Sequence, residues 1–229
     1  YIDSSFLADY YTVEFEQMFI DGNYHKTKKK LKKKDISIIL DEVKVSLFFS
    51  PQGYAVNKGI LPLIKEAKES IDVSIFFLTH NKISKALVAA KERGVNVRVI
   101  LDATAATNGY SKHNYLRENG IDVKVESWGG KMHMKAAVID KKHIIVGSMN
   151  WTLAGEKKND ENTILINNSP ELGAQLFLFF EKMWNSIPNS YLQKDPFPES
   201  IESGTSCYDL IDNDFDDIID ANEKECLKK

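Results

Sequence analysis

The residues best suited to chemistry lie between Lys131 and Asn150, in the stretch KMHMKAAVIDKKHIIVGSMN. They follow the spacings H-x-K-x4-D and G-S-x-N, at His133, Lys135, Asp140, Gly147, Ser148 and Asn150. If these groups converge, they offer an imidazole nucleophile, an ammonium charge and hydrogen-bond donors from a hydroxyl and an amide. Such a set suits a phosphoryl group.

Strand periodicity predicts how these groups come together. If residues 132–139 form a strand, its two-residue period places His133 and Lys135 on one face. A second apolar run, residues 143–146, predicts a hairpin. The end of that hairpin would return Ser148 to the strand that carries the histidine.

This stretch resembles the H-K-D signature of the phospholipase D superfamily, including its G-S-x-N continuation. The flanking chain agrees over roughly residues 43–184, so the resemblance covers most of the protein. The family contains phospholipases D, phospholipid synthases and nucleases.

The resemblance implies a role for each residue. His133 would attack phosphorus and form a phosphohistidine, while Lys135 would neutralise a non-bridging oxygen. Ser148 and Asn150 would donate hydrogen bonds to the remaining oxygens. Glu161 matches the family position that orients the histidine, where a carboxylate fixes the tautomer and raises the basicity of the attacking nitrogen.

Two other acidic residues are not expected to react. Asp140 lies at the predicted hairpin turn, and the resemblance makes it a supporting residue. Asp102 ends a predicted strand at the edge where α/β sheets bind ligands, and we expect it to cap or position the next loop. No cluster of His, Cys and carboxylate residues shows metal-ligand spacing, so we predict metal-independent catalysis without a cofactor.

One H-K-D motif supplies only half of the site that the resemblance implies. The family's chemistry uses two facing histidines, one to attack and one to protonate the leaving group. The second half would come from an upstream repeat, or from a homodimer whose two-fold axis brings both His133 residues to one interface.

An internal match points to the upstream repeat. Residues 2–19 align without a gap with residues 167–184, with matches at Leu7 and Leu172, Phe15 and Phe180, Glu16 and Glu181, and Met18 and Met183. Residues 1–34 are therefore predicted to be the end of an earlier repeat followed by a lysine-rich linker. Because the first residue is tyrosine, we expect the chain to be a piece of a longer protein.

The rest of the chain alternates between strand and helix patterns, which is typical of βαβ units. Strands are predicted over residues 43–49, 71–78, 95–101, 121–126 and 162–166, and helices over residues 57–70, 82–93, 112–119 and 170–184. The predicted fold is α/β: a phospholipase D-like mixed, largely parallel sheet flanked by helices on both faces, or α-β-α sandwich. Residues 35–190 would form the catalytic domain.

Charge is distributed unevenly around a net value of -3. Residues 199–229 carry ten acidic and three basic side chains, a net charge of -7, which leaves +4 for the rest. The tail, residues 191–229, is predicted to be either disordered or one amphipathic helix. The lysine-rich run at residues 25–34 is read either as a solvated linker or as a phosphate-contacting patch.

Cysteines and apolar runs say little about the cellular compartment. Cys207 and Cys226 lie in the tail, where their spacing suits no metal motif and leaves a disulfide an open alternative. No apolar run approaches the roughly 18 residues that span a bilayer, so no transmembrane segment is predicted. The localisation stays open.

The sequence thus predicts a phosphodiesterase of the phospholipase D type, with phospholipid and nucleic acid nearly even as substrates. The lysine run favours nucleic acid, whereas the two-motif layout and the modest charge favour phospholipid. The alternative is a non-catalytic module that keeps the fold and binds nucleic acid or membranes. The complete set of motif residues argues against it, because a binding protein needs no nucleophile.

Overall fold

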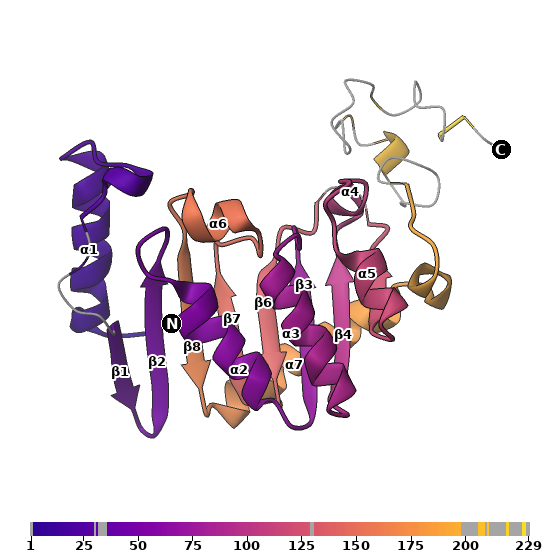
Figure 1. Ribbon diagram of the computed structural model, residues 1–229, viewed down its shortest axis with the longest axis horizontal. Helices are drawn as coiled ribbons and strands as arrows, with labels where there is room; N and C mark the ends of the chain where they lie inside the picture. The colour runs from indigo at the N-terminus through magenta and orange to yellow at the C-terminus, as the bar shows by residue number, and fades with distance from the viewer. Residues whose placement is uncertain are drawn as a thin grey trace.

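The fold is built on one sheet of eight strands in the order β1-β2-β8-β7-β6-β3-β4-β5 (Figure 1). The computed structural model describes residues 2–29, 31, 36–128, 131–197, 206–208, 210, 219 and 226–227. The strands are β1 (Ile36–Leu40), β2 (Val43–Phe49), β3 (Ser70–Ile75), β4 (Asn96–Leu101), β5 (Asp122–Val125), β6 (Lys135–Ile139), β7 (His143–Gly147) and β8 (Asn162–Asn167). The helices are α1 (Ser5–Phe19), α2 (Leu61–Glu66), α3 (Asn81–Glu92), α4 (Ala103–Ala106), α5 (His113–Glu118), α6 (Leu153–Lys157) and α7 (Pro170–Ser186).

The predicted α/β fold with a mixed sheet is confirmed, but the sheet is not largely parallel. Among the described strands, parallel pairing is confined to β3–β4 and β4–β5. The other five pairings are antiparallel. The connections explain the difference, because the crossover through α3 preserves the strand direction, whereas the tight turns between β1 and β2 and between β6 and β7 reverse it.

Helices cover both faces of the sheet, as predicted, with α2, α3 and α5 on one face and α7 on the other (Figure 1). On the first face, Ile64 of α2 and Ile83 and Leu87 of α3 are fully buried in the main core. Each such side chain stabilises the fold by roughly 1.5–3 kcal/mol. Strand β3 is buried at all six positions, as expected for a strand covered on both sides.

Several predicted boundaries shift because tertiary contacts override the local pattern. The helix predicted over residues 57–70 is a π-helical turn (η2, Val56–Ile60) followed by the short helix α2. Strand β1 was not predicted, and it pairs with β2 as an edge strand. Helix α3 ends where predicted, at Gly94, whose φ of +91° is the left-handed conformation that glycine adopts without strain.

The N-terminal segment docks on the domain through a buried lysine. Helix α1 begins at the N-cap Ser4 and packs through Leu7 against the sheet. Beyond it, the buried Nζ of Lys28 lies 2.9 Å from Asp160 Oδ1, and it also contacts Glu14. The lysine-rich run was predicted to be a solvated linker or a phosphate-contacting patch. Both predictions are wrong for Lys28, because its charge is buried and paired with Glu14 and Asp160. Residues 30 and 32–34 of that run lie outside the described part of the chain.

The start of the acidic tail is docked, since Asp195 accepts hydrogen bonds from His113 (2.9 Å) and Arg117 (2.7 Å). The open question of a disulfide is resolved, because Cys207 and Cys226 are bonded to each other. The alternative of disorder or one helix over residues 209–225 falls almost wholly outside the described residues. Of the helices described, none is both long enough and apolar enough to cross a membrane.

We predict that Lys28→Met detaches α1, because the substitution leaves Glu14 and Asp160 without their shared cation. The free energy of unfolding should fall by about 3 kcal/mol, as expected when one partner of a buried ion pair is removed. Urea unfolding measures this loss, and amide hydrogen exchange should rise in α1 while β3 stays protected. The matched control is Lys26→Met, which changes an exposed lysine of the same run. Equal losses in the two variants would contradict the assignment.

Candidate active site

Most of the predicted site residues gather at one edge of the sheet. His133 lies just before β6, Ser148 and Asn150 follow β7, and Glu161 lies just before β8. Because β6, β7 and β8 are consecutive antiparallel neighbours, the starts of β6 and β8 and the end of β7 lie at the same edge. The end of β3 lies there too, since β3 is antiparallel to β6.

His133 and Lys135 share one face, as the strand period predicted, although β6 begins at Lys135 and not at residue 132. The His133 ring packs edge-on against the Phe76 ring, with centroids 4.7 Å apart. The Nζ atom of Lys135 lies 5.0 Å from the same ring centroid and donates to the His133 carbonyl oxygen at 2.8 Å. His133 is exposed, whereas Lys135 is 8% exposed.

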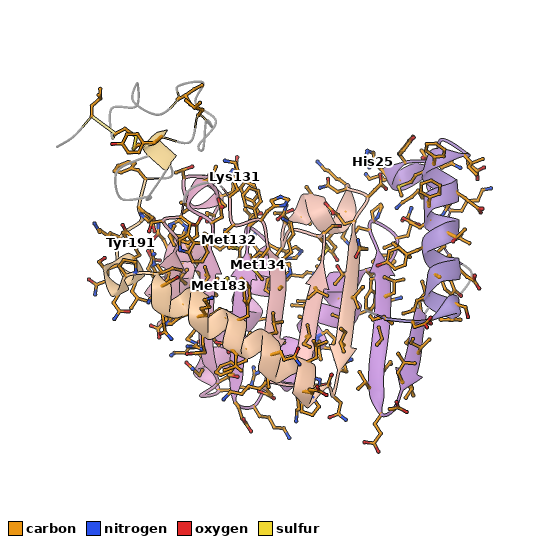
Figure 2. The ribbon with its side chains drawn as sticks, turned by 180° about the vertical axis from the view of Figure 1, so that it is seen from behind. His25, Lys131, Met132, Met134, Met183 and Tyr191 are labelled. Atoms are coloured by element: carbon orange, nitrogen blue, oxygen red, sulfur yellow. A yellow bond between two sulfur atoms is a disulfide. The ribbon has the colours of Figure 1, made fainter. Side chains whose placement is uncertain are left out.

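Two methionines hold the His133 segment from behind. Met132 and Met134 belong to an apolar cluster with Phe180 and Trp184 of α7. Figure 2 shows both methionines on the α7 side of the sheet, with Met183 of α7 below them. Since neighbouring residues in extended chain point to opposite sides, this packing directs His133 away from α7.

Ser148 and Glu161 form the second part of the site. Ser148 Oγ donates to Glu161 Oε2 at 2.5 Å and accepts from the Asn162 amide at 3.1 Å. Asn159 Nδ2 donates to the other Glu161 oxygen at 3.2 Å. The expected hydrogen bond from His133 to Glu161 is not among the contacts of the described residues, but the Glu161 charge partly opposes the lowering of the His133 pKa by burial and by Lys135.

Gly147 makes this approach feasible. A Cβ atom at this position would lie 2.2 Å from the carbonyl oxygen of Asn162 on β8. Glycine therefore lets β7 and β8 come together at the point where Ser148 meets Glu161. In the G-S pair, the glycine has a steric role and the serine a polar one.

Asn150 is fixed by the end of β3. Its Oδ1 accepts from the Phe77 amide at 3.4 Å, and the next residue, Trp151, donates its amide to the Phe77 carbonyl at 3.0 Å. The Asn150 Nδ2 group donates to none of the residues that the structure describes, so it is available for a phosphoryl oxygen.

Asp140 is not brought to the site. It lies at the other end of β6, seven residues from His133, which corresponds to about 23 Å of extended chain. Its carboxylate accepts from the amides of Lys68, Glu69 and Ser70 at 2.8 to 3.2 Å. Burial alone would raise the pKa of Asp140, but these hydrogen bonds outweigh it and hold the pKa below its usual range. The structure gives Asp140 an anchoring role in the fold.

The charges at the edge favour a nucleophilic imidazole. Burial, followed by the charge of Lys135, lowers the pKa of His133. Burial also lowers the pKa of Lys135, while the charges of Glu161 and Asp102 oppose this effect. The lowered pKa favours the neutral imidazole, which presents an unprotonated nitrogen beside an ammonium group.

Sequence reasoning missed two site residues, Phe76 and Glu126. Phe76 carries no motif signal, because its role depends on the β3–β6 pairing. Glu126 carries none either, because its role depends on the pairing of β4 with β5.

Asp102 does what was predicted: it N-caps α4 by accepting from the Ala105 amide at 3.1 Å, and it also accepts from the Met132 amide at 2.8 Å. Among the described residues, no group of three or more His, Cys, Asp and Glu side chains is arranged to hold a metal ion.

Comparisons with known proteins agree with this geometry. A family model described as "Cardiolipin synthase, PLD-like domain" matches residues 60–184, which include every predicted site residue. The phospholipase D of Rickettsia prowazekii is 37% identical over 129 residues, 56% of this chain and 62% of that relative. The mitochondrial cardiolipin hydrolase of Homo sapiens is 34% identical over 143 residues, 62% of this chain and 56% of that relative. The chain thus spans less than two thirds of the length of these two relatives.

A solved structure shares the fold over most of this domain. The crystal structure of Nuc, a phospholipase D family member from Salmonella typhimurium, matches with a TM-score of 0.62 and 32% identity. The match covers 68% of this chain and 99% of that one.

We predict that His133 titrates below 6.5 and that two substitutions move its pKa in opposite directions. Lys135→Met should raise the pKa, because a neighbouring positive charge is removed, and Glu161→Gln should lower it, because a negative charge is removed. Histidine ring resonances followed by NMR against pH measure both shifts. Lys141→Met, at the far end of the hairpin, is the control and should leave the pKa unchanged. Shifts of the same sign in both site variants would refute this electrostatic description.

Proposed function

The chain belongs to the phospholipase D superfamily, and on this premise we propose that it is a metal-independent phosphodiesterase that acts through a phosphohistidine intermediate. One observation carries the proposal: an exposed His133 and the buried ammonium group of Lys135 share a face at one edge of the sheet. The first group supplies the nucleophile, and the second supplies fixed positive charge where negative charge develops.

The proposed reaction has two steps. A ring nitrogen of His133 attacks phosphorus, the bond to the leaving alkoxide breaks, and an acid from the second H-K-D half protonates that alkoxide. Water then cleaves the nitrogen–phosphorus bond, which releases a phosphate monoester and restores His133. Lys135 and the Asn150 amide would bind the non-bridging oxygens.

Ser148 and Glu161 would have supporting roles. Because Ser148 donates to Glu161 in this structure, we assign Ser148 first to holding that carboxylate, and binding of a phosphoryl oxygen would need its hydroxyl to turn. Glu161 would stabilise the positive charge that His133 acquires when the phosphohistidine forms. The hydrogen bond from Asn159 to Glu161 supports this role, because it helps to hold the carboxylate in place.

For the substrate, we propose a phospholipid phosphodiester. The support comes from the similar proteins, among which are a phospholipase D and a cardiolipin hydrolase. An exposed polar edge suits a headgroup phosphate that is presented at a lipid surface.

A second candidate substrate is nucleic acid, which a basic and aromatic patch beside the site favours. Lys58 and Lys157 both lie over the ring of Tyr54, at 5.5 and 5.0 Å from its centroid. Lys157 ends α6, which follows the Asn150 segment closely along the chain. Cations and an aromatic face are the groups that bind phosphates and bases of a single strand.

The second H-K-D half is proposed to come from a preceding repeat, with a homodimer as the other source. Both aligned helices carry a stacked aromatic pair: Phe15 and Phe19 of α1 at 5.1 Å, and Phe180 and Trp184 of α7 at 5.7 Å. The α7 pair is buried against Arg98, whereas the α1 residues are 55% and 76% exposed. The exposed aromatic pair of α1 corresponds to the buried pair of α7. This supports a preceding repeat whose sheet would cover the α1 pair.

We predict hydrolysis of an aryl phosphodiester that persists in EDTA. His133→Asn should abolish it, and Lys135→Met should lower kcat by about 10²–10³-fold, as expected for loss of a group that stabilises developing charge. Lys141→Met is again the matched control and should retain activity. Activity that EDTA removes and a metal ion restores would refute the proposal. A folded but inactive wild type would mean either that the chain needs a preceding repeat or that it is a binding module, and adding the longer chain would decide between the two.

The form of the lipid, the salt concentration and one further variant distinguish the two substrates. Cleavage of phospholipid should require vesicles or micelles and depend weakly on salt. Cleavage of single-stranded nucleic acid should fall steeply with salt, because binding releases counterions, and should weaken in Lys58→Ala.

Protein concentration tests the source of the second half. A homodimer predicts specific activity that rises with concentration in step with dimer formation, as followed by analytical ultracentrifugation. A preceding repeat predicts that this chain alone stays monomeric and nearly inactive at every concentration. Full activity from a monomer would contradict the need for a second half.

A further inference from the structure

Two carboxyl groups that the proposed reaction does not use lie beside the segment that carries His133. Asp102 follows β4 and Glu126 follows β5, and both are 0% exposed. Strands β4 and β5 pair in parallel with Leu101 opposite Val125, so the residues that follow them are neighbours. They lie at the edge of the sheet where His133 lies.

Each carboxyl group links α4 to the His133 segment. All four carboxyl oxygens accept a backbone amide, from Ala103 (3.1 Å) and Trp128 (2.7 Å) on Glu126, and from Ala105 (3.1 Å) and Met132 (2.8 Å) on Asp102. Two of these amides belong to α4, and the other two lie at Trp128 and at Met132, the residue before the nucleophile. The contacts therefore hold the chain at Trp128 and at Met132, directly before His133.

We propose that the Asp102–Glu126 pair is a positioning unit that fixes the main chain of His133 at the reaction edge. The inference rests on the proposed function, since it adds to that site a support that sets the place of the nucleophile. Neither carboxyl group touches the reacting atoms. They act through the Trp128 and Met132 amides.

Burial makes the protonation of the pair sensitive to pH. Burial, with the charge and hydrogen bond of Asp102, raises the pKa of Glu126 to about 7, although the Trp128 and Ala103 amides act in the opposite direction. Burial likewise raises the pKa of Asp102. Below about pH 7 Glu126 is mostly protonated, and above it Glu126 becomes charged and is repelled by the charge of Asp102.

Among the described residues, the titratable groups that face the pair are Lys131, His133 and Lys135. Burial raises the pKa of Asp102 and the charge of Lys131 opposes this rise, while burial lowers the pKa of His133 and Lys135 and the charge of Asp102 opposes that fall. Lys131 also donates to Thr104 of α4 at 3.2 Å, so the same helix and segment are joined a further time. When Glu126 loses its proton, its amide hydrogen bonds favour the charged form, but Lys131 and Lys135 offset the repulsion from Asp102 only in part, so we expect the hold on the His133 segment to weaken.

Turnover should therefore fall above pH 7 through kcat, because the substrate still binds while the nucleophile is less well placed. Glu126→Gln keeps the shape and one acceptor oxygen but does not titrate. It should lower kcat at pH 6.5 by about tenfold, a cost typical of a small misplacement, and change KM less. Its activity should no longer depend on pH between 7 and 9.

The direct test is an NMR titration of the Trp128 and Met132 amide resonances between pH 5.5 and 9. In the wild type both should move with a midpoint of about 7, and in Glu126→Gln neither should. Asp72→Asn is the matched control. Asp72 is also a buried carboxyl group with a raised pKa, but it accepts a hydrogen bond from Arg98. Its substitution should leave the titrations of both amides unchanged. The wild-type titration needs no variant, so the test survives if Glu126→Gln does not fold.

The outcomes separate this proposal from the proposed function. Amides that do not titrate in the wild type, or that titrate equally in Glu126→Gln, would overturn the pair as a positioning unit. Amides that respond while the pH profile of kcat stays the same in both proteins would also overturn it. A wild type without turnover would count against the proposed function, and the amide titrations would still decide whether the pair holds the segment.

Discussion

The pairing of β3 with β6 is the constraint on which the candidate site depends. β3 is parallel to β4 on one side and antiparallel to β6 on the other, so it joins the parallel and antiparallel halves of the sheet. The pairing continues one step past both strands, where the Phe76 amide donates to the Met134 carbonyl at 2.8 Å. That step puts Phe76 against His133 and Lys135. The antiparallel half contributes the polar groups of β7 and β8, and the parallel half contributes the buried carboxyl groups of β4 and β5.

The charged groups at this edge oppose one another in their effects on the pKa values of Lys135 and His133. Lys135 is buried, which would favour its neutral form, and the charges of Glu161 and Asp102 counteract that tendency. The same lysine helps to keep His133 neutral. An ammonium group and a neutral imidazole at adjacent sites are what attack on a phosphodiester needs, because the anion must be attracted without protonating the nucleophile. Each carboxylate is hydrogen-bonded to protein groups, so its charge acts on the site from a fixed distance.

Sequence patterns predicted the parts of the site that depend on local periodicity. A two-residue period placed His133 and Lys135 on one face, and one hairpin brought Ser148 back to them. Asp140 lies at the hairpin turn, as the pattern predicted, but five residues along a strand lead to the opposite edge of a sheet, so it does not join the other motif residues. Contacts between distant segments left no local signal. The burial of Lys28 depends on Asp160, which lies 132 residues later, and Glu126 acquires its role from the register of β4 and β5.

The anchoring of Asp140 separates two kinds of information within one signature. The residue closes the β6–β7 turn and holds the start of β3, so it specifies architecture, while the residues at the other end of β6 specify reactivity. A search for the three-letter pattern therefore scores a scaffold and an activity together. A descendant could replace its reactive pair, keep the aspartate and inherit the whole sheet. For such a protein the motif's last letter would report ancestry, and only the first two would report chemistry.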